Sequence, residues 1–157
     1  IEQIIEVFNN HMDESHVVFM GYGEFEDKLR GLAKCHRRLH FHEAVPHDRV
    51  VSIAQSADFG LCLVPSSNLS LSYLYCLPNK LFEYAFAGLP ILASNFPDIR
   101  KVVETHSLGM LCDANIASIT EIIKRLEAKD HLFVFKDLSI LSWSKQEEKL
   151  LALYEEL

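Results

Sequence analysis

The sequence predicts an α/β fold with a doubly wound, Rossmann-like sheet that is mostly parallel and carries helices on both faces. Two observations lead to this prediction. Short apolar runs alternate along the chain with segments whose apolar residues recur at helical spacing. The runs are apolar almost throughout, as expected for parallel strands that are buried on both faces.

The first half of the chain alternates helix and strand. Apolar residues at helical spacing, beginning with Ile1, Ile4 and Ile5, predict an amphipathic helix over residues 1–12. The elements that follow are expected at 17–20 (strand), 25–33 (helix), 39–42 (strand), 47–56 (helix) and 59–64 (strand).

The second half continues this alternation after a serine-rich stretch at 66–72, which lacks periodicity and is expected to be a loop. The later elements are expected at 79–87 (helix), 91–93 (strand), 98–105 (helix), 108–112 (strand), 116–126 (helix) and 143–157 (helix). The last helix places Leu150, Leu151, Tyr154 and Leu157 on one face.

Composition indicates one packed domain spanning residues 1–157, because 157 residues with 49% hydrophobic content suffice for one core of this type but not for two. The 15 basic and 22 acidic residues give a net charge of −7, which argues against nucleic acid as a partner.

No apolar run approaches the ~18 residues of a transmembrane span. Four cysteines without a C-x-x-C pair are typical of reduced cysteines in a cytoplasmic protein.

Two histidines, His40 and His42, fall on one face of an expected strand, with His36 and His47 nearby in sequence. A zinc site needs three or four converging ligands, and this spacing does not fix such convergence. We therefore expect no metal and interpret the histidines as polar residues at the exposed end of a strand.

A glycine pair, Gly21 and Gly23, follows the first expected strand, where glycines allow a close backbone approach to a ligand. Glu43 lies 20 residues after Gly23, where an NAD-binding domain would carry its ribose-binding acid. The third glycine of the dinucleotide fingerprint is replaced by Glu26. An NAD-binding Rossmann domain therefore remains only an alternative.

The stretch from Leu77 to Ile91 is the most informative for function. Pro78 and Asn79 suit a helix start, and Gly88 with Pro90 suits its end. Lys80 stands at the first helical turn, so the helix N-terminus and this lysine form a possible anion site. Glu83, one turn further on, can accept hydrogen bonds from the vicinal hydroxyls of a sugar. Phosphate beside ribose indicates a nucleotide, although Glu83 could instead serve only the fold.

The motif formed by Pro78, Lys80, Glu83, Tyr84, Gly88 and Pro90 resembles the donor-site motif P-x-K-x-x-E-Y-x-x-x-G-x-P of GT-B glycosyltransferases, most closely the retaining family 4 type. Further segments are similar to that family at 17–25, 39–45, 57–65 and 143–154. The resemblance covers nearly the whole chain but only the C-terminal, donor-binding half of such an enzyme. It implies a hexosyltransferase-type enzyme of polysaccharide or glycoconjugate biosynthesis, with its N-terminal acceptor domain outside this sequence.

The resemblance also implies roles for individual residues. Glu83 would accept the ribose hydroxyls, while Lys80 would stabilise the diphosphate as the catalytic cation, together with the amides of Lys80 and Leu81. The turn of Gly21 and Gly23 would approach the donor, and the loop at Val45 would hold the nucleobase. The partners implied are a nucleoside diphosphate sugar and the protein's own acceptor domain, with no cofactor. Membrane association through that other domain stays open.

One departure concerns Tyr75. Family 4 enzymes commonly carry two glutamates eight positions apart, and Tyr75 stands eight positions before Glu83. Contact with the transferred sugar would then come from Tyr75 or Asn79, or from Ser72 or Tyr73. A non-hydrolysing sugar-nucleotide epimerase, which shares the GT-B architecture, is an alternative enzyme.

The position of the first helix leads to one structural expectation. In a doubly wound sheet the first strand lies in the middle, between the second and the fourth. If the helix at residue 1 follows such a strand, we expect residues upstream of Ile1, or another chain, to fill the centre of the sheet. The alternative is that the strands at 17–20 and 59–64 pair directly.

Overall fold

The computed structural model describes residues 1–12, 14–64, 70–128 and 133–155. It has an α/β fold, in which parallel strands form two sheets flanked by helices, as the sequence predicted. The strands are β1 (Val17–Met20) paired with β2 (Leu39–His42), and β3 (Gly60–Cys62), β4 (Ile91–Ser94) and β5 (Gly109–Cys112) paired in that order. Every pair is parallel.

The helices are α1 (Glu2–Asn10), α2 (Glu26–Cys35), α3 (His47–Ala54), α4 (Leu71–Leu74), α5 (Asn79–Phe86), α6 (Pro97–His106), α7 (Ile116–Glu127) and α8 (Trp143–Glu155), with a 3-10 turn at Ser139–Leu141. Helix α4 lies where a loop was expected, because Ser70 caps it by accepting a hydrogen bond from the amide of Tyr73. The rest of that expected loop, residues 65–69, lies outside the described residues.

The core consists of two clusters of buried hydrophobic residues. One cluster joins β1 and β2 to α1, α2 and α7, and the other joins β3, β4 and β5 to α5 and α6. Strand β4 contributes to both, with Leu92 in the first cluster and Ile91 and Ala93 in the second. This alternation explains why β4 is buried along its whole length.

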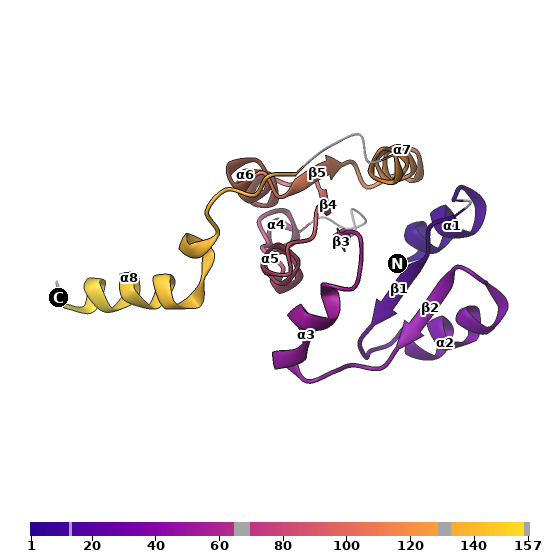
Figure 1. Cartoon of the computed structure of the whole chain (residues 1–157), viewed down its shortest axis with the longest axis horizontal. Helices are drawn as coiled ribbons and strands as arrows, with labels where there is room; N and C mark the ends of the chain where they lie inside the picture. The colour runs from indigo at the N-terminus through magenta and orange to yellow at the C-terminus, as the bar shows by residue number, and fades with distance from the viewer. Residues whose placement is uncertain (13, 65–69, 129–132, 156–157) are drawn as a thin grey trace.

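The two sheets are separate, since β1 and β3 are not hydrogen-bonded neighbours among the described strands. Figure 1 shows β1 and β2 on one side, β3 to β5 on the other, and the N-terminus between them. The half of the molecule with β1 and β2 contacts the half with β3 to β5 through α1, which packs on α7. In addition, Nε2 of Gln3 in α1 donates to Ala114 O at 3.1 Å. Direct pairing of the strands at 17–20 and 59–64, which the sequence analysis named as the alternative to its own expectation, is not found among the described strands.

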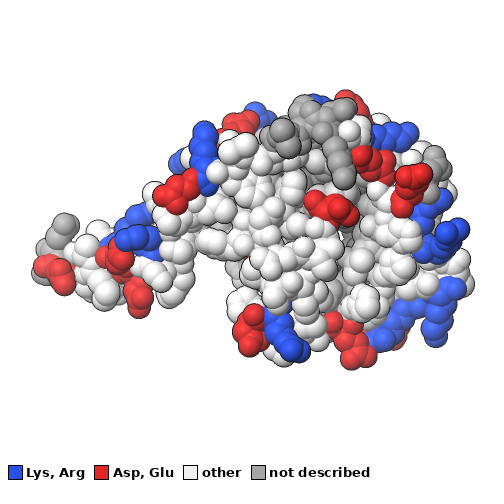
Figure 2. Space-filling model, in the orientation of Figure 1, with Lys and Arg blue, Asp and Glu red and all other residues white. Residues whose placement is uncertain are grey.

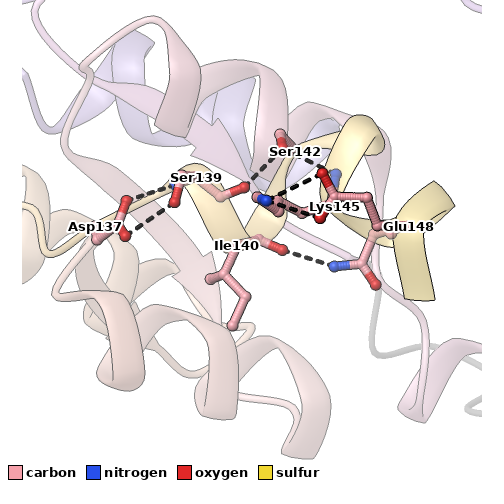
Figure 3. Close-up of polar contacts among 7 residues, drawn as sticks. Asp137, Ser139, Ile140, Ser142, Lys145 and Glu148 are labelled. Carbon is pink, nitrogen blue, oxygen red and sulfur yellow. Dashed lines mark hydrogen bonds and ion pairs between the residues drawn. The ribbon is translucent and has the colours of Figure 1, made fainter. Parts of the chain in front are cut away.

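The C-terminal helix projects from the rest of the molecule (Figure 1). The corner before it is held by local hydrogen bonds (Figure 3): the Asp137 carboxylate accepts from Ser139 N at 2.8 Å, and Ile140 O accepts from the side chain of Gln146 at 2.6 Å. The apolar face predicted for this helix is exposed at Leu150, Leu151 and Tyr154, because no described element covers it. The fourth residue of that face, Leu157, lies outside the described residues. No helix in the described ranges is long and apolar enough to cross a membrane.

Candidate functional site

Helix α5 begins with an N-terminus that no side chain caps. The N-cap residue is Pro78, whose backbone angles (φ −66°, ψ 140°) lead into the helix, so Asn79 is the first helical residue. Although an asparagine at a helix start can cap a free amide, Asn79 does not cap α5. The amide of Leu81 donates to Pro78 O at 3.0 Å, whereas that of Lys80 has no acceptor within the described ranges. An uncapped first turn is open to an anion.

Lys80 reaches back from this first turn to the neighbouring strand. Its Nζ donates to the carbonyl of Leu63 at 3.4 Å, just beyond the carboxyl end of β3. The contact uses one of three ammonium donors, so two remain for a ligand. The half-buried ammonium is thereby held at the edge of the sheet where parallel α/β domains bind ligands.

Glu83 lies one turn further along α5, and its side chain is 22% exposed. Its Oε1 lies 3.8 Å from Nδ1 of His47, whose side chain is 85% exposed. No other partner of this carboxylate is found among the residues that the structure describes. A carboxylate that is largely shielded from water and retains free acceptor positions suits a ligand that donates hydrogen bonds.

The tyrosine of the motif has a packing role. The ring of Tyr84 lies against Gly60 of β3, so closely that a Cβ built on Gly60 would be 2.4 Å from the ring. Burial raises the pKa of the Tyr84 hydroxyl. The contact between Tyr84 and Gly60 holds α5 against β3 and thereby fixes where Lys80 and Glu83 stand.

One cavity, with a volume of about 1930 Å³, brings together four of the residues that the sequence singled out. Gly21, Val45, Lys80 and Glu83 all line it, from three separate segments of the chain. Tyr22 also lines it, although its place between two glycines was the only sequence feature that pointed to it. The cavity extends into the space between the sheet of β1 and β2 and the sheet of β3, β4 and β5.

The other candidates do not line this cavity. Gly23 has a positive φ of +144°, like Gly21 at +153°, so both need glycine for the shape of the turn. The side chain of Leu81 is fully buried in the core and its amide donates to Pro78 O, so neither group is free for a ligand. Asn79 and Tyr75 are exposed, and Tyr75 follows α4.

His47 is the residue at this site that sequence reasoning did not assign. Its ring meets Glu83 because α3 packs on α5, and residues 47 and 83 are far apart in the chain. The sequence feature that could have pointed to His47 is its position at the start of α3, directly after the loop that contains Val45.

The histidine considered for a metal site and the glutamate considered for NAD binding both contact other side chains. Nε2 of His40 lies 2.7 Å from Nδ1 of His16, and the described ranges hold no group of three metal-ligating side chains. The Glu43 carboxylate accepts from Arg30 at 2.9 Å, and Arg30 also binds Glu26 at 2.8 Å. The acid that an NAD-binding domain would use for ribose is therefore engaged in a surface ion pair.

The four cysteines are free thiols that differ in exposure. Cys62 and Cys112 are buried, and burial raises the pKa of their thiols to about 11 and about 12. Cys35 is exposed and Cys76 is half-buried. The two buried cysteines lie in strands β3 and β5.

In this parallel α/β domain a helix N-terminus, a lysine and a shielded carboxylate meet at the carboxyl edge of the sheet, the edge where such domains bind their ligands. The model of a family described as Glycosyl transferases group 1 matches residues 1–129, and the chain belongs to this family. No curated protein matches the chain. The matched range contains Gly21, Tyr22, Val45, Lys80 and Glu83, which line the cavity. The resemblance to glycosyltransferases is therefore confirmed at the level of the family.

Proposed function

We propose that the chain is the donor-binding domain of a retaining GT-B glycosyltransferase of the family 4 type. It binds a nucleoside diphosphate sugar, and the sugar passes to an acceptor held by the N-terminal domain of the same protein. The observation that carries the proposal is that Lys80 and Glu83 line one cavity with Gly21 and Val45, beside the uncapped start of α5.

The diphosphate lies at the start of α5 in this proposal. The free amide of Lys80 and the positive end of the helix dipole attract the anion, and the Lys80 ammonium adds a full charge. Negative charge grows on the diphosphate as the bond to the sugar breaks, so these fixed groups stabilise the transition state more than the ground state. Lys80 is held in place for this role by Leu63 O.

The ribose lies one turn further along α5. Its two vicinal hydroxyls donate to the carboxylate of Glu83, which has free acceptor positions and is largely shielded from water. The nucleobase then lies toward the loop at Val45, which lines the same cavity. The glycine turn at Gly21 lets the main chain come close to the donor without a side chain in between.

The transferred sugar is contacted from the other side of the α5 start. Asn79 is exposed there at the first helical position, and Tyr75 is exposed just before it in the chain. These two residues take the place of the first glutamate of the family pattern. A hexose is the proposed group, for use in polysaccharide or glycoconjugate biosynthesis.

Calorimetric titration of the full-length protein with UDP, GDP and ADP tests the proposal, with NAD as the control ligand. We expect one of the diphosphates to bind and NAD to leave that binding unchanged. Binding of NAD alone would overturn the assignment.

A second measurement separates the transferase from an epimerase of the same architecture. The full-length protein is incubated with the nucleotide sugar whose diphosphate bound, without any acceptor. We expect no interconversion of the sugar, because a transferase moves it only when an acceptor or water receives it. Interconversion to the epimer would show the other activity.

A further inference from the structure

Tyr22 is an exposed aromatic residue at the carboxyl edge of the sheet. It follows the end of β1 by two residues, and it is 89% exposed. Its ring and hydroxyl have no hydrogen-bond or ring partner in the part of the chain that the structure describes. Of the two tyrosines among the described residues that line the cavity, Tyr84 packs against Gly60, so Tyr22 is the one whose ring is open to a ligand. Single exposed tyrosines are common on protein surfaces, so the position of this one must decide whether it has a role.

The turn that carries Tyr22 has a fixed shape. Gly21 and Gly23 flank the tyrosine with φ of +153° and +144°, in a region that glycine adopts readily and other residues rarely do. The turn is tied at both ends. The amide of Gly21 donates to His42 O at 3.2 Å, and the carbonyl of Gly23 accepts from Glu26 N at 3.0 Å. The ring of Tyr22 therefore extends from a short, anchored turn.

The loop that follows β2 lies beside this turn. Strands β1 and β2 are parallel, with Met20 opposite His42, so the chain leaves both strands at the same edge of the sheet. Neighbouring strands are about 4.8 Å apart, which places Tyr22 within reach of residues 43–46. Tyr22 and Val45 both line the cavity. The turn and the loop are thus neighbours at its border.

Helix α2 holds both the turn and the loop. Its first residue, Glu26, is the one that donates to the carbonyl of Gly23. One turn further along, Arg30 donates to the Glu43 carboxylate at 2.9 Å and to that of Glu26 at 2.8 Å. The guanidinium of Arg30 also lies over the ring of Phe41, 4.8 Å from its centre. The start of the loop is therefore attached to the same helix that anchors the turn, which keeps the two at a constant separation.

The loop offers hydrogen bonds, whereas the ring offers a flat surface. The amides of Ala44 and Val45 have no partner within the described ranges, so they can bind the polar edge of a planar ligand. Hydrogen bonds to the edge of a base leave its two faces uncovered, and an aromatic side chain can cover a face by stacking. In the space-filling view, the crevice between the half with β1 and β2 and the half with β3 to β5 is bordered mainly by uncharged residues (Figure 2). Such surroundings suit a neutral base.

We propose that Tyr22 stacks on the nucleobase of the donor nucleotide, while the backbone of the loop at Val45 binds the edge of that base. This inference rests on the proposed function, because it requires a nucleotide whose ribose lies at Glu83. The loop then distinguishes one base from another, and the ring adds affinity that differs little between bases, since every base has a face to stack on. The hydroxyl of Tyr22 takes no part.

Two substitutions of Tyr22 test the proposal by calorimetry on the full-length protein, with whichever of UDP, GDP and ADP the unchanged protein binds. Tyr22→Ala removes the ring and should weaken binding about 5- to 150-fold, as expected for the loss of one stack between a base and an aromatic ring. Tyr22→Phe keeps the ring and should change the affinity less than about twofold, because the hydroxyl has no partner to lose. Tyr154→Ala is the matched control, since this exposed tyrosine of α8 does not line the cavity, and it should leave binding unchanged.

Nuclear magnetic resonance separates stacking from an indirect effect on the turn. The ring current of a tyrosine moves the signals of base protons upfield when the base lies over the ring. We expect this upfield shift on binding, together with nuclear Overhauser contacts between the ring protons of Tyr22 and the base. In Tyr22→Ala at saturating nucleotide, the upfield shift should be lost. Binding without these contacts, equal losses for Tyr22→Ala and Tyr22→Phe, or an unchanged affinity of Tyr22→Ala would each overturn the proposal.

The outcome of these experiments is distinct from a failure of the proposed function. If a diphosphate binds and its affinity depends on Glu83 but not on Tyr22, the donor site stands and the stacking is refuted. If none of the three diphosphates binds the unchanged protein, the proposed function is overturned and the role of Tyr22 with it.

Discussion

The carboxylate of Glu83 and the imidazole of His47 meet where α5 packs on α3, with 3.8 Å between Oε1 and Nδ1. The two side chains differ sharply in exposure, at 22% and 85%. A ligand that reaches Glu83 therefore enters beside an exposed imidazole, along the surface that α3 and α5 share.

Replacing Glu83 by glutamine tests its role as a ribose acceptor. The substitution keeps the shape of the side chain but removes its charge, and hydrogen bonds to a charged group contribute about 1.5–3 kcal/mol. We expect about 10- to 100-fold weaker binding of the nucleoside diphosphate by calorimetry, with the thermal midpoint nearly unchanged. Glu104→Gln, on the exposed side of α6, is the matched control and should change neither quantity. A lower midpoint with unchanged affinity would instead assign Glu83 to the fold.

Replacing Lys80 by methionine tests the diphosphate contact. Methionine keeps most of the apolar stem and loses the ammonium, so the loss should depend on the phosphates of the ligand. We expect the nucleoside diphosphate to bind at least ~10-fold more weakly, while the corresponding nucleoside binds nearly as before. Lys101→Met on exposed α6 serves as the control. Equal losses for nucleoside and diphosphate would contradict a phosphate-specific role.

Gly21→Ala tests the turn after β1. Gly21 has φ +153°, a region in which a non-glycine residue costs about 1–3 kcal/mol. We expect a lower urea midpoint and weaker nucleotide binding, because the strained turn lines the cavity. Gly31→Ala provides the contrast, since Gly31 lies within α2 with open space around a Cβ. That change should stabilise the protein by about 0.5–1 kcal/mol, so equal midpoints for the two variants would refute the prediction.

The thiols should differ in reactivity and in their effect on stability at high pH. At about pH 8 an alkylating reagent should modify exposed Cys35 in the native protein, and Cys62 and Cys112 only after denaturation. Folding raises the pKa of these two thiols from 9.0 to about 11 and about 12. Above pH 9 the unfolded chain ionises them while the native state does not, so their burial should lower stability progressively as the pH rises.

Peptide mass spectrometry and urea midpoints measure the two effects. Cys35→Ser should abolish modification at residue 35 in the native protein. Cys112→Ala should reduce the part of the stability loss that occurs between pH 9 and about 12. Rapid modification of Cys112 without denaturant would contradict the burial of this thiol.

Strand positions could be predicted closely from the sequence where burial and hydrogen bonding coincide. The strands at 17–20 and 39–42 match their predicted ranges, because each apolar run is also the paired segment. The run at 59–64 is longer than β3, since Phe59, Leu63 and Val64 pack into the core without being part of the strand. An apolar run indicates which residues are buried. The strand itself ends where its hydrogen bonds to the neighbouring strand end.

The rest of the structure depends on contacts that sequence patterns do not specify. The apolar face of α8 was predicted, but amphipathicity does not identify what covers it, and the described chain leaves it exposed. Lys80 and Glu83 could be selected because both belong to one helix start. His47 could not, because its meeting with Glu83 depends on how α3 and α5 pack.

The division of the sheet also has a consequence for how the chain folds. Strands β1 and β2 pair across a single intervening helix, and so do β4 and β5, so these contacts form between segments close in sequence. Contacts across the middle of the molecule, such as Gln3 with Ala114, join segments more than a hundred residues apart. Closing such long loops is entropically unfavourable and slow. The cavity lined by Lys80 and Glu83, which draws residues from both halves, should therefore be completed late, after each half has formed its own local structure.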